Sequence, residues 1–292
     1  MRRIVAIVAI SSALALAGCA ATPAGVDGNL VNDWKALPAP TAVLPVEGDC
    51  YSSPAADMLE NAPVACTTDH EVEVVHVGIF DSADAAKPNA PAAGTTAMKG
   101  AYGVCLGAAK KYLGADFHDG LMELNVVTPD ANGWAGGQRW FRCDVNQVEA
   151  LSDLELTGST VSFKGILAKA GPLKLACVSW VDKGSYIDDW TLTACSKSHT
   201  GEYVGTYTAP NVAYTVKKFN ALGDNGCWPL VARYLGISAS SGSNTVGWAY
   251  SYTDEDAWAN GDHYIRCYAA AFTHDKKFVG SVKGIGTRTA KG

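Results

Sequence analysis

The sequence predicts an α+β protein made of two tandem homologous modules, each an antiparallel sheet with one main helix and two disulfides. Three observations support this prediction. The 292 residues are 48% apolar and 18% charged, which is typical of a globular chain long enough for two domains. The cysteines repeat at similar spacing in the two halves of the chain. Within each half, β-rich segments surround one segment with helical periodicity.

The first 18 residues are typical of a signal peptide. Arg2 and Arg3 supply positive charge, and the apolar run from Ile4 to Leu16 that follows is too short to span a bilayer. The run ends in Leu16-Ala17-Gly18-Cys19, which resembles the lipobox of bacterial lipoproteins. That resemblance implies cleavage before Cys19, acylation of its sulfur and a lipid anchor at the extracytoplasmic face of the cell membrane. The alternative is an ordinary secretory signal, and export follows on either interpretation.

The charge of the chain argues against nucleic acid as a partner. With 23 basic and 29 acidic residues the net charge is −6, and no basic cluster is longer than a pair of lysines. Removal of Arg2 and Arg3 brings the charge to −8, so attraction to anionic lipid does not hold the mature chain at the membrane. Residues 19–47 are rich in proline and alanine and are expected to form a flexible tether, or in part a strap that uses Trp34 and Leu37.

Eight further cysteines indicate an internal duplication. The first four are separated by 16, 39 and 38 residues, and the second four by 18, 32 and 40 residues. The flanking sequence repeats with them, which predicts one module at residues 48–168 and a second at residues 174–290. The cysteines are Cys50, Cys66, Cys105, Cys143, Cys177, Cys195, Cys227 and Cys267.

An even number of cysteines in an exported chain predicts disulfides. Pairing within each module, in the same manner in both, leaves three patterns, and we favour the pairing of neighbouring cysteines. A metal-thiolate cluster is the rival interpretation. It requires closely spaced cysteines, and no two of these eight are nearer than 16 residues, so no metal is expected.

Each module has one segment with the periodicity of an amphipathic helix. The first runs from Ala101 to Leu113 and ends at Gly114. The second runs from Ala221 to Leu235, but Pro229 suits only a first helical turn, so we expect this helix to begin near Cys227. The segments that predict strands are 71–80, 121–128, 140–148, 160–167, 203–208, 246–253, 264–273 and 278–285.

His70 and Glu73 are the first candidates for metal binding or proton transfer. On a strand, however, an offset of three directs two side chains to opposite faces. We therefore expect a structural role, in which His70 hydrogen-bonds backbone near its disulfide and Glu73 pairs with Arg142. The second module repeats these residues as His199, Glu202 and Arg266.

No catalytic signature stands out. The sequence has no G-x-S-x-G, no P-loop and no dinucleotide-binding G-x-G-x-x-G in a strand-to-helix context. His118, His263 and His274 have no counterpart in the other module. The sequence thus predicts a protein that is not an enzyme and that needs no cofactor. A less favoured alternative is an envelope hydrolase that uses His70 or His199.

Aromatic residues are numerous in the second module and could stack on cell-wall sugars. Trp248, however, aligns with Leu124, and Tyr250 aligns with Val126, which favours positions in the core. Two further tryptophans stand nine residues before a cysteine, and we expect them to cap the hydrophobic core near the second disulfide of each module. They are Trp134 and Trp258.

The cysteine framework and its flanks resemble the septum formation domain of actinobacterial envelope proteins, in two tandem copies. The second copy departs from the pattern, because Leu175-Ala176 stands where Gly48-Asp49 precedes the first cysteine. The resemblance implies a part in septum formation during cell division, and it implies no reaction, cofactor or catalytic residue. It rests on the cysteines and on His70, Glu73, Trp134, Arg142, His199, Glu202, Trp258 and Arg266.

The sequence therefore predicts a lipid-anchored, extracytoplasmic protein with a binding or scaffolding role in septum formation or envelope assembly. The expected partners are the membrane, through Cys19, and an envelope protein, a division protein or a cell-wall component. A module that binds cell-wall glycan is the alternative.

Overall fold

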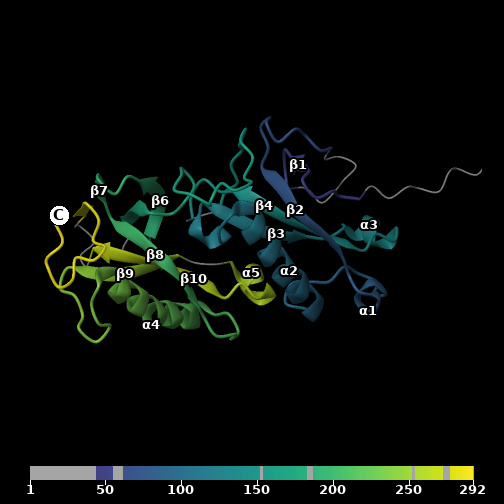
Figure 1. Ribbon diagram of the computed structural model, residues 1–292. Helices are drawn as coiled ribbons and strands as arrows, with labels where there is room; N and C mark the ends of the chain where they lie inside the picture. Colours follow the sequence, from purple (N-terminus) through teal and green to yellow (C-terminus); the bar gives the residue numbers. More distant parts are fainter. Residues whose placement is uncertain are drawn as a thin grey trace, which may run out of the picture. The chain divides into compact units, whose positions relative to one another are not determined.

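The computed structural model describes residues 44–54, 62–151, 154–182, 187–251, 254–271 and 277–291 (Figure 1). The predicted signal peptide, Cys19, most of the predicted tether and His274 lie outside the described residues. The fold is α+β with antiparallel sheets, as predicted. Below, residues 48–168 are the first half and residues 174–290 the second half. Among the helices of the described part, none combines the length and the hydropathy of a membrane span.

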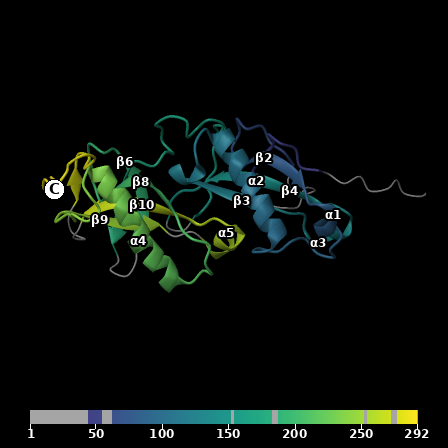
Figure 2. The same cartoon turned by 60° about the horizontal axis from the view of Figure 1, so that its bottom comes forward.

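The first half contains a four-stranded antiparallel sheet in the order β1-β2-β4-β3. Helix α2 (Thr96–Leu113) lies across this sheet and contacts β2, β3 and β4 (Figure 2). Local chemistry sets both helix ends. The Thr95 hydroxyl accepts a hydrogen bond from the amide of Met98, and Gly114 ends the helix at φ 81°, a conformation that favours glycine. The strands are β1 (Cys50–Tyr51), β2 (Val72–Ile79), β3 (Met122–Val127) and β4 (Trp140–Gln147).

The second half contains a five-stranded antiparallel sheet in the order β6-β5-β8-β10-β9. Helix α4 (Val216–Leu235) contacts β8, β9 and β10, as α2 contacts the corresponding strands of the first half. Two short strands, β7 and β11, pair with each other separately. The strands are β5 (Cys177–Asp182), β6 (Ile187–Thr193), β7 (Ser198–His199), β8 (Gly201–Thr208), β9 (Val246–Ser251), β10 (Tyr264–Ala271) and β11 (Phe278–Val279).

Helix α4 begins earlier than predicted. It starts at Val216, after the hydroxyl of Thr215 caps its first turn, and Pro229 lies in its interior instead of its first turn. Proline costs the helix one hydrogen bond, whereas the preceding turns bury an apolar surface against the sheet. Gly226 contributes to this contact, because a Cβ there would lie 2.1 Å from the ring of Tyr207. Tertiary packing therefore overrides the boundary expected from proline.

Four short helices were not predicted from periodicity, because each is too short to show one. Each begins after an aspartate whose carboxylate accepts hydrogen bonds from the first turn, so an N-cap signal was present in the sequence. They are α1 (Ser82–Ala85), the 3-10 helix η1 (Phe117–Asp119), α3 (Ala131–Ala135) and α5 (Glu255–Asn260).

Two predicted strands are wrong in whole or in part. Residues 160–167 form turns, and of residues 278–285 only Phe278–Val279 is a strand. The backbone of these segments bonds to helix ends instead of a sheet. The amide of Gly165 donates to the carbonyl of Tyr112, and the amide of Gly284 donates to the carbonyl of Tyr234. Alternating hydrophobicity could not predict these hydrogen bonds to the helix ends, because Tyr112 and Tyr234 are remote in sequence from the glycines that bond to them.

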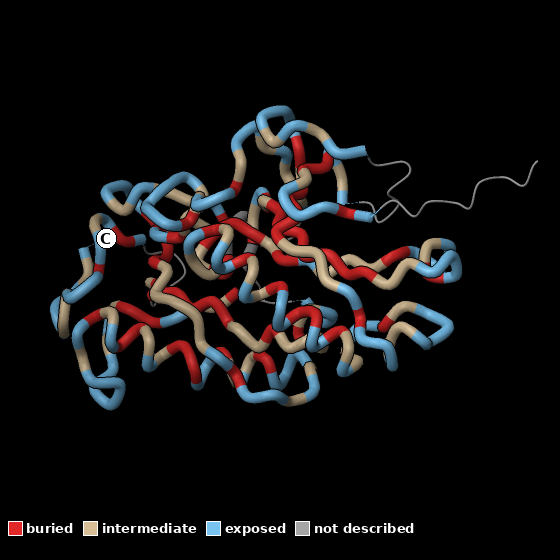
Figure 3. Tube along the Cα trace, turned by 45° about the vertical axis from the view of Figure 1, so that its right-hand side comes forward, coloured by how far each residue is buried: buried red, intermediate tan, exposed pale blue. Residues whose placement is uncertain are grey.

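The cores follow the two sheets but are not fully separate. One cluster surrounds α2 in the first half, and two surround α4 in the second. A further cluster joins the halves, since it combines Leu121, Val148 and Leu151 with Leu175 and Val178. Figure 3 shows buried stretches toward the interior of the trace and exposed residues mainly where the trace turns at its outside. The described residues of the two halves therefore share part of one core.

Four disulfides confirm the pairing of neighbouring cysteines. The Cα atoms of each pair lie 5.1 to 5.4 Å apart, within the usual range for a disulfide. In each half, one disulfide joins the main helix to a central strand. The other joins β1 to the loop before β2 in the first half, and joins β5 to the turn between β6 and β7 in the second half. The pairs are Cys50–Cys66, Cys105–Cys143, Cys177–Cys195 and Cys227–Cys267.

Removal of a disulfide between helix and strand should destabilise the protein strongly. Replacement of Cys105 and Cys143 by alanine opens a link across 38 residues, and we expect the free energy of unfolding to fall by about 4 kcal/mol. Both cysteines are also fully buried, so a small cavity adds to the loss. Urea unfolding at equilibrium measures the effect. A loss below about 1 kcal/mol would show that this link does not constrain the unfolded chain.

Candidate functional site

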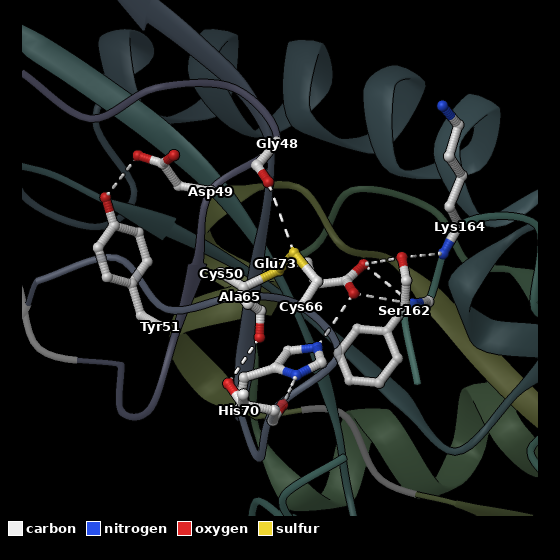
Figure 4. Close-up of a disulfide and its surroundings, with 12 residues drawn as sticks. Gly48, Asp49, Cys50, Tyr51, Ala65, Cys66, His70, Glu73, Ser162 and Lys164 are labelled. Atoms are coloured by element: carbon white, nitrogen blue, oxygen red, sulfur yellow. Dashed lines mark hydrogen bonds and ion pairs between the residues drawn. A yellow bond between two sulfur atoms is a disulfide. The ribbon is translucent and has the colours of Figure 1, made fainter. Parts of the chain in front are cut away.

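A buried histidine–glutamate pair lies beside the first disulfide of the first half (Figure 4). Nε2 of His70 lies 3.0 Å from Oε1 of Glu73, and Nδ1 of His70 lies 2.8 Å from the carbonyl oxygen of Thr68. The carboxylate of Glu73 also accepts hydrogen bonds from the amide of Phe163, at 2.9 Å, and from the hydroxyl of Ser162, at 3.3 Å. The pair thus joins the chain after Cys66 to residues 162–163.

The second half repeats this arrangement. Nε2 of His199 lies 3.1 Å from Oε1 of Glu202, and Nδ1 of His199 lies 2.8 Å from the carbonyl oxygen of Lys197. The backbone partners of the two histidines are therefore equivalent. Glu202 accepts three more hydrogen bonds, from the amide of Val282 at 2.7 Å, the hydroxyl of Tyr234 at 2.6 Å and the hydroxyl of Ser281 at 2.7 Å.

The predicted divergence of histidine and glutamate is wrong. His70 does not belong to the strand of Glu73, because β2 begins only at Val72. His70 instead forms an isolated bridge with Ser159, and the bend between bridge and strand turns its ring toward Glu73. In the second half, His199 lies on β7, opposite Phe278 of β11, and Glu202 lies on β8. Strand alternation does not apply across such a break.

The predicted pairing of glutamate with arginine is also wrong. Arg142 is buried and binds the carboxylate of Asp144, with Nη2 2.9 Å from Oδ2. Arg266 donates to the carbonyl oxygens of His118 and Met122 in the first half. The two equivalent arginines therefore have different partners. Arg142 binds a carboxylate of its own strand, whereas Arg266 binds backbone carbonyls of the other half.

These two clusters are closed. The side chains of His70, Glu73, His199 and Glu202 have no exposed surface, and both ring nitrogens of each histidine face an acceptor oxygen. A proton must therefore lie between each histidine and its glutamate, since both atoms would otherwise be acceptors. In this arrangement each cluster acts as a latch that holds the loop of one disulfide to a later loop.

Sulfur atoms lie near both carboxylates. The Sγ atoms of Cys50 and Cys66 and a carboxylate oxygen of Glu73 are all within 4.8 Å of one another. The Sγ atom of Cys177 has the same relation to His199 and Glu202. These sulfurs are bonded in disulfides, and a metal ligand requires a thiolate. The donor set therefore does not fit a metal ion while the disulfides are intact.

Trp134 and Trp258 lie where the sequence predicts them. Trp134 belongs to the same buried cluster as the disulfide of Cys105, and Trp258 belongs to that of Cys227. Each indole donates a hydrogen bond to a backbone carbonyl on the loop before the main helix, at 2.8 Å in both cases. They therefore fasten that loop over the core.

The contact between the halves contains a site that the sequence analysis missed. His118 lies between two carboxylates, with Nδ1 2.6 Å from Oδ1 of Asp116 and Nε2 3.0 Å from Oδ1 of Asp262. Asp262 belongs to the second half, and both His118 and Asp262 are buried. The sequence favours no role for His118, because no histidine matches it in the other half. No local signal connects it to an aspartate 144 residues away.

The electrostatics of this site favour a charged triad. Burial alone would lower the pKa of His118, but Asp262 and Asp116 outweigh burial and raise it. Burial would raise the pKa of Asp262 and of Asp116, yet the contact with His118 lowers both below their ordinary value. Nearby, burial and then the charge of Asp254 raise the pKa of Glu123 to about 7. The charged histidine thus binds the two halves together through Asp262.

The core position predicted for Trp248 is wrong. Its side chain is 39% exposed and packs against Trp228, with ring centroids 5.6 Å apart and ring planes inclined at 50°. Tyr250 is partly buried and packs against Phe219 instead. The aligned Leu124 is buried, so the same strand position differs in exposure between the halves. Trp248 is the one tryptophan among the exposed large apolar residues of the described part, so the described tryptophans do not line up on an exposed face.

Fold and site together define a disulfide-stabilised α+β protein with two similar latches and a buried ionic contact between its halves. Comparison with known proteins identifies the family. A sequence profile described as septum formation matches residues 47–267, a single stretch that includes the first half and most of the second. The chain belongs to the septum formation family. No curated protein and no solved structure matches it.

Proposed function

We propose that this chain is a lipid-anchored protein at the extracytoplasmic face of the cell membrane, with a binding or scaffolding role in septum formation. The family match over residues 47–267 carries the proposal. Four disulfides support an extracytoplasmic location, because such bonds persist in oxidising compartments. The sequence that ends in Leu16-Ala17-Gly18-Cys19 supports the lipid anchor.

The role that we propose is not enzymatic. The two histidine–glutamate pairs are the candidates for chemistry that the sequence offers, and both are fully buried and hydrogen-bonded. A general base must reach the proton that it abstracts, and here each histidine reaches only its glutamate and a backbone carbonyl. Their contacts support a role in holding loops in place.

We also propose that the two halves arose by duplication of one module. Equivalent hydrogen bonds support this, because the contacts of His70 and Glu73 recur at His199 and Glu202 with nearly equal distances. The shared cluster and the contact of His118 with Asp262 imply that the modules act as one unit. In such a scaffold the two halves keep a fixed relative orientation, so a partner can bind both at once.

The lipid anchor is testable by replacement of Cys19 with serine. Serine cannot be acylated through sulfur, so we expect the variant to leave the membrane fraction while the unchanged chain remains there. Immunoblots of membrane and soluble fractions measure the distribution, and a replacement of Ser11 by alanine within the apolar run serves as the control. Retention of the Cys19→Ser chain in the membrane fraction would contradict the proposal.

The scaffolding role is testable by crosslinking in dividing cells. The full chain is expected to crosslink to envelope or division proteins, and their recovery should fall when the Cys19→Ser chain is used. Mass spectrometry of the crosslinked material identifies them. Recovery of the same proteins from cells arrested before septation would argue against a role in the septum.

A further inference from the structure

A cavity near the end of the described chain has not yet been assigned a role. It follows β11 and has a volume of about 370 Å³, within the range typical of small-molecule sites. One continuous segment supplies its walls. The lining residues are Val279, Gly280, Ser281, Val282, Lys283, Ile285, Arg288, Thr289 and Lys291.

Every charged residue that lines this cavity is basic. Lys283, Arg288 and Lys291 contribute three positive charges, and no acidic residue lines it. Across the part of the chain that the structure describes, none of the three takes part in an ion pair. The whole chain has a net charge of −6, so a purely cationic cavity runs against its overall charge. Like charges that share a concave surface favour an anionic occupant.

The segment that lines the cavity is bonded to the histidine–glutamate cluster of the second half. Ser281 and Val282 donate hydrogen bonds to the buried carboxylate of Glu202. The amide of Gly284 donates to the carbonyl of Tyr234 at the end of α4. The amide of Val279 donates to the carbonyl of Lys291, which brings the two ends of the segment together. The backbone that carries these basic residues is therefore already ordered. The ammonium of Lys283 lies 5.9 Å from the ring centroid of Tyr234, and Nε of Arg288 donates to the carbonyl of Ile285 at 2.9 Å.

We propose that this cavity binds a phosphate group carried on a polyol or a sugar. Lysine and arginine are the usual partners of phosphate, whose tetrahedral oxygens can accept hydrogen bonds from several directions. The hydroxyl of Thr289 adds a donor, and Val279 and Ile285 offer apolar surface to the carbon atoms of the ligand. Both a soluble wall polymer and a lipid headgroup carry such a group. This assignment does not depend on a role in septum formation.

The first half provides a matched control. Lys164 aligns with Lys283, and Lys169 aligns with Arg288, whereas Pro172 stands at the position of Lys291. The first half therefore has two of the three cationic residues at equivalent positions. Replacement of Lys164 and Lys169 by glutamine removes the same charge as replacement of Lys283 and Arg288, but leaves the proposed site intact.

The test is calorimetric titration of the purified full chain, in detergent, with a soluble poly(glycerol phosphate). We expect binding that weakens as salt is added, because ion pairing drives it. The double variant Lys283→Gln and Arg288→Gln should lose about tenfold or more in affinity, and the Lys164→Gln and Lys169→Gln variant should lose little. Absence of binding by the unchanged chain both to this polymer and to the phosphatidylglycerol vesicles described below, or an equal loss in both variants, overturns the proposal.

Two further arms complete the test. Vesicles of phosphatidylglycerol, compared with phosphatidylcholine, replace the polymer, and binding to these vesicles alone identifies the lipid headgroup as the source. Equal binding of a polyglutamate of matched charge overturns the assignment to phosphate. Acetylation of Lys283 and Lys291, followed by mass spectrometry, needs no variant. The polymer should slow acetylation at Lys283 and Lys291 but not at Lys164. If the polymer changes the acetylation rate equally at all three lysines, the proposed site is wrong.

Discussion

Replacement of Asp262 by asparagine is expected to lower the free energy of unfolding by about 3 kcal/mol at about pH 5.5. Asp262 faces the buried ring of His118, with Nε2 3.0 Å from Oδ1 and 3.1 Å from Oδ2. Asparagine preserves the shape but removes the charge that balances the histidine. The contact between the halves then holds a buried cation with only Asp116 opposite.

The loss should depend on pH in both directions. The pKa of His118 is raised, so its stabilisation is fully present below the ordinary value of 6.5 and is lost as the pH rises through the folded pKa. The pKa of Asp262 is lowered, so its stabilisation is present above the ordinary value of 3.8 and is lost as the pH falls through the folded pKa. The effect of Asp262→Asn should therefore be largest between these two ordinary values.

Urea unfolding at several pH values measures this dependence, because urea does not screen charges. Glu255 is exposed on the neighbouring α5, and its replacement by glutamine is the control, with an expected change within about 0.5 kcal/mol. The explanation fails if the loss for Asp262→Asn is the same at about pH 3, 5.5 and 9. It fails as well if the loss matches that of the control.

Replacement of Glu202 by alanine should cost about 4 kcal/mol or more. The carboxylate accepts hydrogen bonds from four groups, and it has no exposed surface. Alanine leaves these donors buried without an acceptor and opens a cavity between two loops. Glutamine retains the shape and one acceptor oxygen, so Glu202→Gln should cost less, about 1 to 3 kcal/mol.

The first half again offers a matched comparison, since Glu73 makes the same contacts with His70 and with the amide of Phe163. Glu73→Ala should therefore lower the free energy of unfolding by a similar amount, measured by urea unfolding. If either alanine variant is as stable as the unchanged chain, the latch interpretation is wrong. A larger loss for glutamine than for alanine would likewise contradict it.

The two halves show what local sequence patterns can predict here. The repeated cysteine spacing reduced the possible disulfide connections to three, since similar spacing implies the same pairing in both halves. The favoured pattern, between neighbouring cysteines, is the one that the structure contains. Helical periodicity followed by glycine located the ends of α2 and α4 at Gly114 and Gly236. The recurrence of His70 and Glu73 at the same offset marked them as a unit, although their geometry was misjudged.

Other features depended on contacts between remote residues. Strand alternation gave the wrong geometry for His70 and Glu73, because the chain bends between them to pair with Ser159. The partner of His118 lies in the other half, where no repeated position indicates it. The cavity after β11 likewise depends on a remote contact. The turn around Gly284 that helps to form it is held by a hydrogen bond to the end of α4, which no local pattern predicts.

By itself, the sequence reduced the cysteine pairing to three patterns, and it determined the fold class, the C-terminal ends of the two main helices and most of the strands, because each of these depends on the spacing and chemistry of residues near one another in the chain. Only the tertiary structure decided how the histidines meet their glutamates, how the halves bind each other through Asp262, and where three basic residues line one cavity. Those arrangements arise from contacts across about 50 to 150 residues, such as Gly284 with Tyr234 and His118 with Asp262. The energy of such contacts is set by packing and burial, which no local pattern encodes.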